Sequence, residues 1–226
     1  MQAKLAIAAA TAALLIAASE SVAGSIDLNN QAETGRVPPG TSVGYTVRPG
    51  SGRALLVCEY TLNDTAQAPT YNGAPLTYVV KSSYFGVGRL GVAAYLMLDP
   101  PDGTYPLTLN GTETLRAFIL SFVNVAGIDG VSSAQASSQI TITDTVTTTH
   151  KNAFLAMCET DSGASDDSWA HSTYYGVVYL TDSGLSFGGR TALGRGAVSM
   201  SIRAGKGNPP PATYLADVLV GLSPTP

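Results

Sequence analysis

The stretch Arg53-Ala-Leu-Leu-Val-Cys-Glu59 has a second copy in this chain, Ala153-Phe-Leu-Ala-Met-Cys-Glu159. The two copies are one hundred positions apart when Cys58 is aligned with Cys158. Each contains four or five apolar residues, then Cys, then Glu, and then a polar loop. A short apolar run bounded in this way predicts a strand that is buried on both faces. We therefore predict that the two copies are the inner strands of two related halves of one β-sandwich.

The composition favours an all-β protein. Of the 226 residues, 45% are hydrophobic, which allows a sizeable core, and only 12% are charged, against about 25% in a typical domain. The 24 Gly and 13 Pro residues suit short strands joined by tight turns. With a net charge of −4 and scattered Lys and Arg, the chain lacks the basic concentration of a nucleic-acid-binding protein. So weakly charged a surface is typical of one that neighbouring molecules cover.

Residues 1–23 differ from the rest of the chain. Lys4 is followed by an apolar run from Leu5 to Ala18, interrupted by Thr11, and then by a small polar segment. This three-part pattern is typical of a secretory signal, and the run is too short for an ordinary membrane span. The alternative is an Ala-rich helix or arm that is retained and packs against a partner. Residues 24–42 are polar and predict a linker.

Residues 43–226 are predicted to form one β-sandwich domain, with halves at about 43–130 and 138–223. Asn72-Gly73 and Asn110-Gly111 predict hairpin turns, because Asn and Gly both tolerate positive φ. We predict ten or eleven short strands and no amphipathic helix after residue 24. Their regular spacing favours a sandwich or jelly roll. Besides the two repeated stretches, the clearest strand patterns cover residues 43–47, 90–98, 115–125, 140–149, 173–180, 197–202 and 214–222.

A resemblance follows from the order of these motifs. Pro69-Thr-Tyr-Asn-Gly-Ala-Pro-Leu-Thr77 precedes an apolar strand with Tyr95-Leu96, then Pro100-Pro-Asp-Gly-Thr104, and the chain closes with the strand from Leu215 to Leu222. This order resembles jelly-roll-type β-sandwich domains, such as those of phage structural proteins and bacterial surface proteins. The resemblance covers roughly residues 43–223 and implies a jelly-roll-like fold. It rests on turn and core residues, so it carries no catalytic residues over to this chain.

Two glycine patterns match enzyme motifs without their structural context. Gly86-Val-Gly-Arg-Leu-Gly91 has the dinucleotide-binding spacing, but the residues after it predict a strand where that motif needs a helix. Gly184-Leu-Ser-Phe-Gly188 matches the nucleophile elbow, but both histidines precede Ser186 and no helix signal follows. We expect a glycine-rich turn at the first pattern, no cofactor, and a protein that is not an enzyme.

Two groups of residues are candidate metal ligands. Calcium prefers several oxygen ligands from a flexible loop, but the acidic stretch after the second copy matches no known calcium loop. The two histidines that flank this copy lack the spacing of a zinc site. A solvated turn and ordinary histidines are therefore favoured. The residues concerned are Asp161, Ser162, Ser165, Asp166 and Asp167 in the first group, and Asp144, His150, Glu159 and His171 in the second.

The cysteines and one aromatic cluster each leave two alternatives. Cys58 and Cys158 can form one disulfide if they lie on facing strands, or they can remain two buried thiols. Trp169, Tyr174 and Tyr175 lie close together in the sequence. They can form an exposed platform for a sugar ring or a protein interface, or they can belong to the core.

These observations favour a non-enzymatic structural protein of a large assembly. We expect a virion surface component, such as a capsid decoration, minor capsid or fibre protein, that acts through contacts with other structural proteins and with copies of itself. Nucleic-acid binding and a stable membrane span are not expected. The alternative is a secreted or cell-surface binding module, with sugars as candidate ligands, from which residues 1–23 are removed on export.

Overall fold

The computed structural model describes residues 24–35, 37–62, 67–84, 90–111, 116–137, 141–161, 168–170, 174–178, 184–203 and 214–226. In this part of the chain all regular secondary structure is β-strand. The strands are β1 (Asp27–Glu33), β2 (Ser42–Val47), β3 (Ala54–Leu62), β4 (Thr70–Tyr71), β5 (Ala74–Pro75), β6 (Thr77–Tyr84), β7 (Leu90–Leu98), β8 (Gly103–Thr108), β9 (Arg116–Val123), β10 (Val125–Ser137), β11 (Thr141–Thr148), β12 (Phe154–Asp161), β13 (Ser168–Ala170), β14 (Tyr174–Val178), β15 (Gly184–Thr191), β16 (Gly196–Arg203) and β17 (Tyr214–Pro224).

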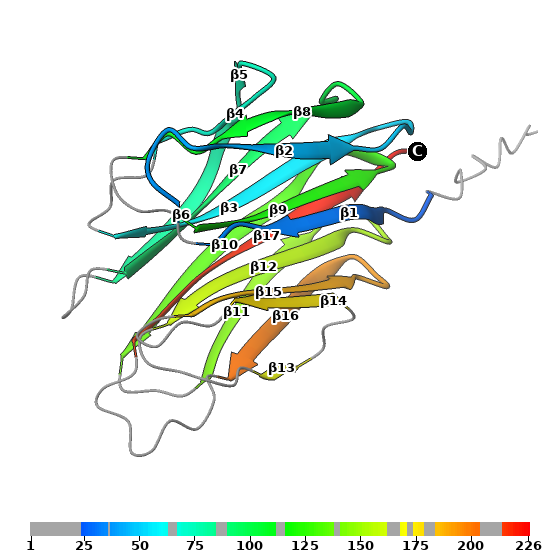
Figure 1. The fold of residues 1–226 in the computed structure, drawn as a ribbon. Coiled ribbons are helices and arrows are strands. Elements are labelled where there is room, and N and C mark those ends of the chain that lie inside the picture. The colour runs from blue at the N-terminus through cyan, green and yellow to red at the C-terminus, as the bar shows by residue number, and fades with distance from the viewer. Residues whose placement is uncertain are drawn as a thin grey trace, which may run out of the picture.

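Each half of the chain forms its own pair of antiparallel sheets (Figure 1). The first half has a five-stranded sheet in the order β1-β9-β3-β7-β6 and a four-stranded sheet in the order β2-β8-β4-β5. In the second half the corresponding orders are β10-β17-β12-β15-β14 and β11-β16-β13. When β5 is left out, the successive strands of the first half and those of the second half occupy equivalent places in the sheets. β5 alone lacks a described counterpart. The repeat seen in two short stretches therefore extends over the whole fold.

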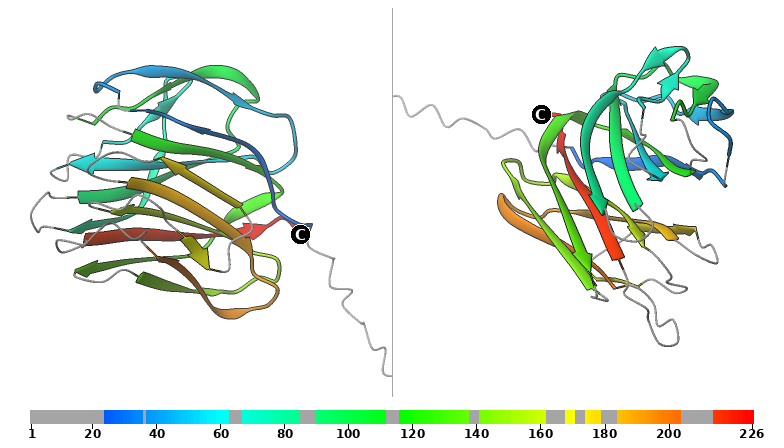
Figure 2. Two further views of the ribbon diagram at one scale, coloured as in Figure 1. Left: turned by 60° about the horizontal axis from the view of Figure 1, so that its bottom comes forward. Right: turned by 90° about the vertical axis from the view of Figure 1, so that its left-hand side faces the viewer.

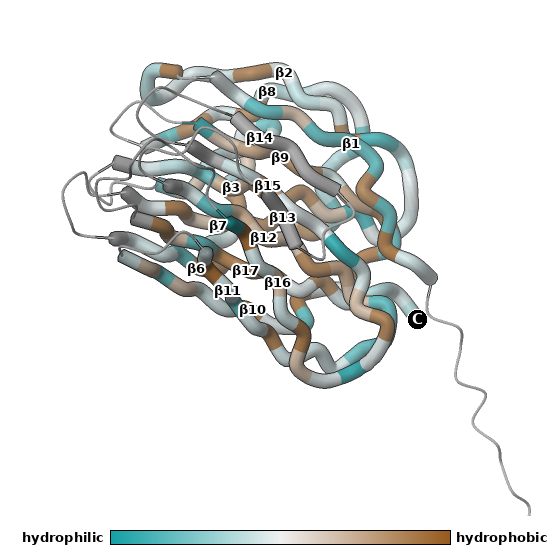
Figure 3. Tube along the Cα trace, turned by 90° about the horizontal axis from the view of Figure 1, so that it is seen from below, coloured by the Kyte–Doolittle hydropathy of each residue, from teal (hydrophilic) through white to brown (hydrophobic). Residues whose placement is uncertain are grey.

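The four sheets stack into layers (Figure 2). Apolar residues recur along their strands (Figure 3), and the buried ones pack into clusters between the sheets. The central layer lies between the two five-stranded sheets, and each half has an outer layer between its own two sheets. The predicted all-β, sandwich-like fold with two related halves is thus confirmed, and each half contributes two sheets to it rather than one. Representative residues are Leu56, Phe122, Phe154 and Val220 in the central layer, Leu55, Tyr71 and Leu107 in the first outer layer, and Leu155, Met157 and Met200 in the second.

β3 and β12 lie at the centres of their sheets. Successive side chains of a strand point to opposite faces, so Leu56 enters the central layer and Leu55 the outer layer of the first half. Phe154 and Leu155 are divided in the same way in the second half. The prediction that these two stretches are buried on both faces is confirmed.

Two polar segments form strands in the structure, although their sequences predicted connections between strands. Within the predicted linker 24–42, residues Asp27–Glu33 form β1 and pair with β9. The Gly-, Ser- and Ala-rich stretch between the predicted halves belongs to β10, which pairs with β17 along its length. The halves meet at Asn124, whose φ of 63° turns the chain from β9 into β10. Both strands lie at sheet edges, where backbone pairing to a single neighbour can hold a chain that has few apolar side chains.

β15 lies in a segment for which the sequence predicted no strand. It pairs with β12 on one side and with β14 on the other. Its glycines weaken the strand pattern, but packing requires one of them: a Cβ on Gly189 would lie 2.7 Å from Cζ of Phe154.

The Asn72-Gly73 turn is confirmed between β4 and β5, with φ values of 50° and 77°. The predicted N-terminal segment 1–23 lies outside the described residues.

Candidate functional site

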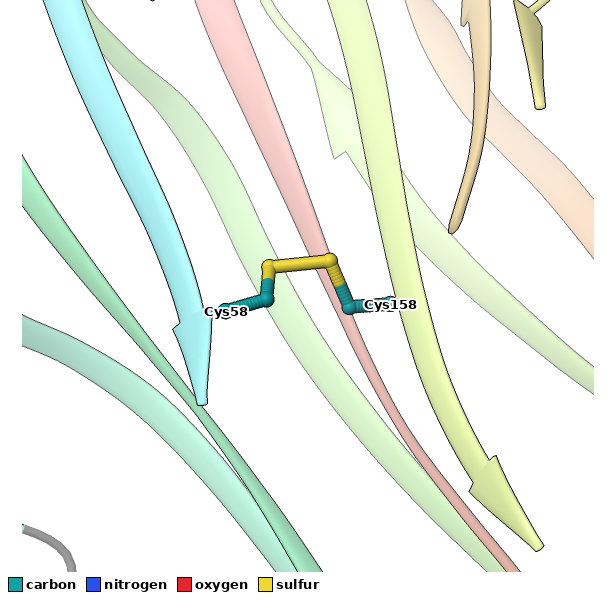
Figure 4. Close-up of a disulfide and its surroundings, with 2 residues drawn as sticks. All are labelled: Cys58 and Cys158. Atoms are coloured by element: carbon teal, nitrogen blue, oxygen red, sulfur yellow. A yellow bond between two sulfur atoms is a disulfide. The ribbon is translucent and has the colours of Figure 1, made fainter. Parts of the chain in front are cut away.

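A disulfide joins Cys58 of β3 to Cys158 of β12 across the central layer (Figure 4). The two Cα atoms are 6.4 Å apart, and both cysteines are buried. β3 lies between β7 and β9, and β12 lies between β15 and β17, so the bond connects the interiors of the two five-stranded sheets. It also joins equivalent positions of the repeat. Of the two alternatives that the sequence left open, the structure contains the bridge.

The glutamate after each cysteine points the opposite way. Because side chains alternate along a strand, Glu59 and Glu159 face the outer layers of their own halves, and both are fully buried. Glu59 lies between Ala93 of β7 and Ala117 of β9. Glu159 lies between Ser186 of β15 and Asp217 of β17. The repeated glutamate therefore has apolar neighbours in the first half and polar neighbours in the second.

Four polar side chains gather in the outer layer of the second half, and we call them the buried acid cluster: Asp144, Glu159, Ser186 and Asp217. The Ser186 hydroxyl donates a hydrogen bond to Oε2 of Glu159 at 2.9 Å. Asp217 faces Asp144 of β11, whose Oδ1 accepts a hydrogen bond from the Thr145 amide at 2.7 Å. The pKa of Asp217 is raised to about 9, mainly by burial and in addition by the adjacent carboxyl of Asp144. Asp217 is therefore protonated at neutral pH.

Glu59 is the isolated counterpart of this cluster. Neither of its carboxyl oxygens has a hydrogen-bond partner among the described residues. Burial raises the pKa of Glu59 to about 8, because an ionised carboxylate in an apolar layer loses its hydration without compensation. This side chain is also protonated in the folded protein at neutral pH.

The burial of the cluster limits its chemistry. Glu159, Ser186 and Asp217 are 0% exposed, and Asp144 is 7% exposed, so a substrate cannot reach them in this conformation. Despite the three carboxyl groups, no set of His, Cys, Asp and Glu side chains in the described chain is arranged to hold a metal ion. What the arrangement can do is store protons inside the second sandwich and link its stability to pH.

No protein-family model, curated protein or solved structure matches this chain.

A second polar site lies where β10 and β11 meet the turn before β12. The Asp129 carboxylate accepts hydrogen bonds from the amides of Thr149 and His150, from the Thr149 hydroxyl, and from Nδ1 of His150 at 2.7 Å. Burial alone would raise the pKa of Asp129, but these hydrogen bonds together lower it below its ordinary value. The His150 side chain is 53% exposed, which leaves the other side of its ring toward solvent. An Asp–His pair orients an imidazole, and catalysis would need a nucleophile or substrate beside it.

The candidate motifs of the sequence lie in different parts of the structure, and several lie outside its described residues. Ser186 lies in the interior of β15, where the nucleophile-elbow motif would need a strand-to-helix turn. Trp169 lies in β13, and Tyr174 and Tyr175 lie in β14, so Trp169 belongs to a different sheet from the two tyrosines; the side chains of all three lie outside the described part. Residues 85–89, 162–167 and 171–173, which hold most of the Gly86–Gly91 motif, most of the acidic stretch and His171, also lie outside it.

Sequence reasoning missed Ser186 as a partner of Glu159, and it missed Asp217 and Asp129. Ser186 and Asp217 come next to Glu159 through strand pairing, which the linear sequence does not reveal. Asp129 lies in the Gly-, Ser- and Ala-rich residues 126–138, which show no clear strand pattern but belong mostly to β10. A polar residue inside an otherwise apolar closing strand was the available signal for Asp217. The described residues also contain no helix that is long and apolar enough to span a membrane.

Proposed function

We propose that this protein is a non-enzymatic structural component of a large assembly, such as a capsid decoration, minor capsid or fibre protein on a virion surface. The observation that carries this proposal is the pair of stacked sandwiches with a disulfide between their central strands. A shared apolar layer and a covalent bond together hold the two halves in one fixed orientation. Such a body is suited to presenting surfaces at a set spacing.

The strand order supports the assignment of each half to the jelly-roll type. When β6 is set aside, the first half consists of two four-stranded sheets with the orders β1-β9-β3-β7 and β2-β8-β4-β5. These are the neighbours expected when eight strands fold as two Greek keys. The second half has the same order without a counterpart of β5. Jelly rolls are common in viral capsid proteins, and also in lectins.

Exposed apolar side chains support a role in protein contacts. Large apolar residues are exposed in both halves, four of them on strands and one in a loop, and charged residues make up only 12% of the chain. Tyrosine is enriched at protein interfaces, and exposed aliphatic side chains gain free energy when a partner removes them from water. The residues are Tyr78, Leu98, Ile128, Val131 and Leu193.

A second candidate function is a secreted or cell-surface binding module. The disulfide favours it, since such bonds persist in oxidising compartments outside the cytosol. The leader-like pattern of residues 1–23 points in the same direction. A sugar would be the first ligand to test, with Trp169 as the first residue to replace.

The test follows the native protein in its source. A density gradient of the source material, probed with an antibody against this chain, should show the protein in the fraction of large particles. Intact mass spectrometry of that fraction should show whether residues 1–23 are retained. A chain that stays at the top of the gradient, runs as a monomer and lacks about 2 kDa at its N-terminus contradicts the assembly proposal. A glycan-array signal that Trp169→Ala abolishes would then establish the binding module.

A further inference from the structure

The loop that connects β15 to β16, two strands of different sheets, forms a pocket of about 510 Å³ at one end of the second half. Its lining includes two arginines, Arg190 and Arg195, together with Leu193, Val198 and Ser199, and no acidic residue. The backbone of this loop is anchored to the rest of the half. The Thr148 hydroxyl donates to the carbonyls of Gly194 and Gly196, and the Asn152 amide donates to the carbonyl of Ala192.

The two guanidinium groups have spare hydrogen-bonding capacity. Among the described residues, Arg190 makes one side-chain hydrogen bond, from Nη1 to the Ser199 carbonyl at 3.3 Å. Arg195 is exposed, and neither arginine forms an ion pair within the described residues. Guanidinium carries five donors in a planar fork that matches a carboxylate. Two like charges on one pocket are best stabilised by an anionic group between them.

The same loop carries an exposed apolar side chain, that of Leu193. Leu193 is 86% exposed, more than any other large apolar side chain in the described chain. Arginine is enriched at protein interfaces, and an exposed leucine beside it offers an apolar contact that a free ion cannot make.

The equivalent loop of the first half, between β7 and β8, has a similar backbone but lacks these arginines. The turn after β7 has the same backbone anchor, since the Asp99 amide donates to the Arg53 carbonyl as the Ala192 amide donates to the Ala153 carbonyl. Both turns end in a glycine with similar φ, 119° at Gly103 and 117° at Gly196. The first turn has Asp102 immediately before that glycine, where the second has Arg195. The positive charge is therefore not a requirement of the turn.

We propose that this pocket binds an acidic peptide segment of a protein partner. The carboxylate lies between Arg190 and Arg195, and an apolar side chain of the same segment packs on Leu193. This inference rests on the proposed function, because it names the kind of neighbour that one surface of the assembly component would receive.

The test measures fluorescence anisotropy of a labelled hexapeptide of alternating Glu and Leu, titrated with the full chain. We expect saturable binding that weakens about tenfold between roughly 50 and 300 mM salt. Arg195→Glu should weaken binding at least about tenfold, and Leu193→Ser should weaken it several-fold. Arg203→Glu is the matched control, because Arg203 is an exposed arginine at the other end of β16. It should change binding by less than about twofold.

Three results would overturn the proposal: no peptide binding, equal binding of the peptide with Gln in place of Glu, or equal loss of binding in Arg203→Glu. Inorganic phosphate provides a further arm. Phosphate binding that depends on Arg195 without any peptide binding would assign the pocket to a free anion and overturn the peptide partner. The assay uses isolated protein, so a negative result removes this pocket assignment alone. The proposed function instead fails when the chain is absent from the particle fraction.

Discussion

Glu59 and Glu159 occupy equivalent positions, but their neighbours make them different groups. Glu59 lies between two alanines, whereas Glu159 accepts a hydrogen bond from Ser186 and has Asp217 on the adjacent strand. A buried carboxyl without a partner is tolerated in its protonated form, because the neutral acid has a smaller desolvation cost. The same residue type at the same backbone position therefore depends on its lateral neighbours for its protonation behaviour.

At the residue scale, replacing Glu59 by Gln tests this account. Gln has nearly the same shape and carries no titrating proton, so it should remove the pH dependence that Glu59 contributes. We expect the variant to be more stable than the parent protein at about pH 8 and close to it at about pH 5. Urea unfolding at both pH values measures the difference. Glu33→Gln, on an exposed residue of β1, is the control and should follow the parent at both.

At the scale of elements, two contacts determine how the halves are joined. Gly52, with φ 55°, lies against the start of β10: its carbonyl accepts the Val125 amide, and a Cβ on it would lie 2.7 Å from the Val125 carbonyl oxygen. The disulfide then ties the central strands of the two five-stranded sheets. One contact sets the junction of the chain, and the other fixes the stacked sheets.

Gly52→Ala should destabilise the protein by about 1–3 kcal/mol, because alanine is strained at positive φ and its methyl group would meet backbone atoms. The free energy of unfolding in urea gives the measurement. Gly35→Ala is the matched control, since a Cβ there would have no atom within 4 Å. A loss of equal size in both variants would contradict the role of the Gly52 junction.

Removing the disulfide with Cys58→Ala and Cys158→Ala together should cost about 2–5 kcal/mol, since the bond closes a long loop. The cysteines are 100 positions apart. The comparison is made by denaturant unfolding of oxidised parent and double variant under identical conditions. Unchanged stability would mean that the central apolar layer alone holds the two halves.

At the scale of the whole molecule, buried acids should make the folded state most stable in mildly acidic solution. The pKa of Glu59 is raised to about 8 and that of Asp217 to about 9, so between about pH 5 and pH 8 the folded protein holds protons that the unfolded chain has lost. Stability should therefore fall as pH rises through this range, by up to about 1.4 kcal/mol per pH unit for each group.

Asp129 acts in the opposite direction at lower pH. Its pKa is lowered, so the stability that it contributes is lost as pH falls through its folded-state pKa. Unfolding free energies measured from about pH 3 to pH 9 should thus pass through a maximum on the acidic side of neutrality. Replacing Asp217 by Asn should reduce the decline on the alkaline side. A profile that rises from pH 5 to pH 8 would contradict the protonation states assigned to both buried acids.

The sequence by itself determined the all-β class, the burial of the two repeated strands and the Asn72-Gly73 turn, because hydrophobic runs and turn residues act over a few neighbouring positions. It did not reveal β1, β10 or β15, whose backbones are held by pairing partners from distant parts of the chain. Only the tertiary structure decided that each half closes its own sandwich and that Ser186 and Asp217 come beside Glu159. Strand pairing and sheet stacking join residues far apart in sequence, and no local pattern records which neighbours they will have.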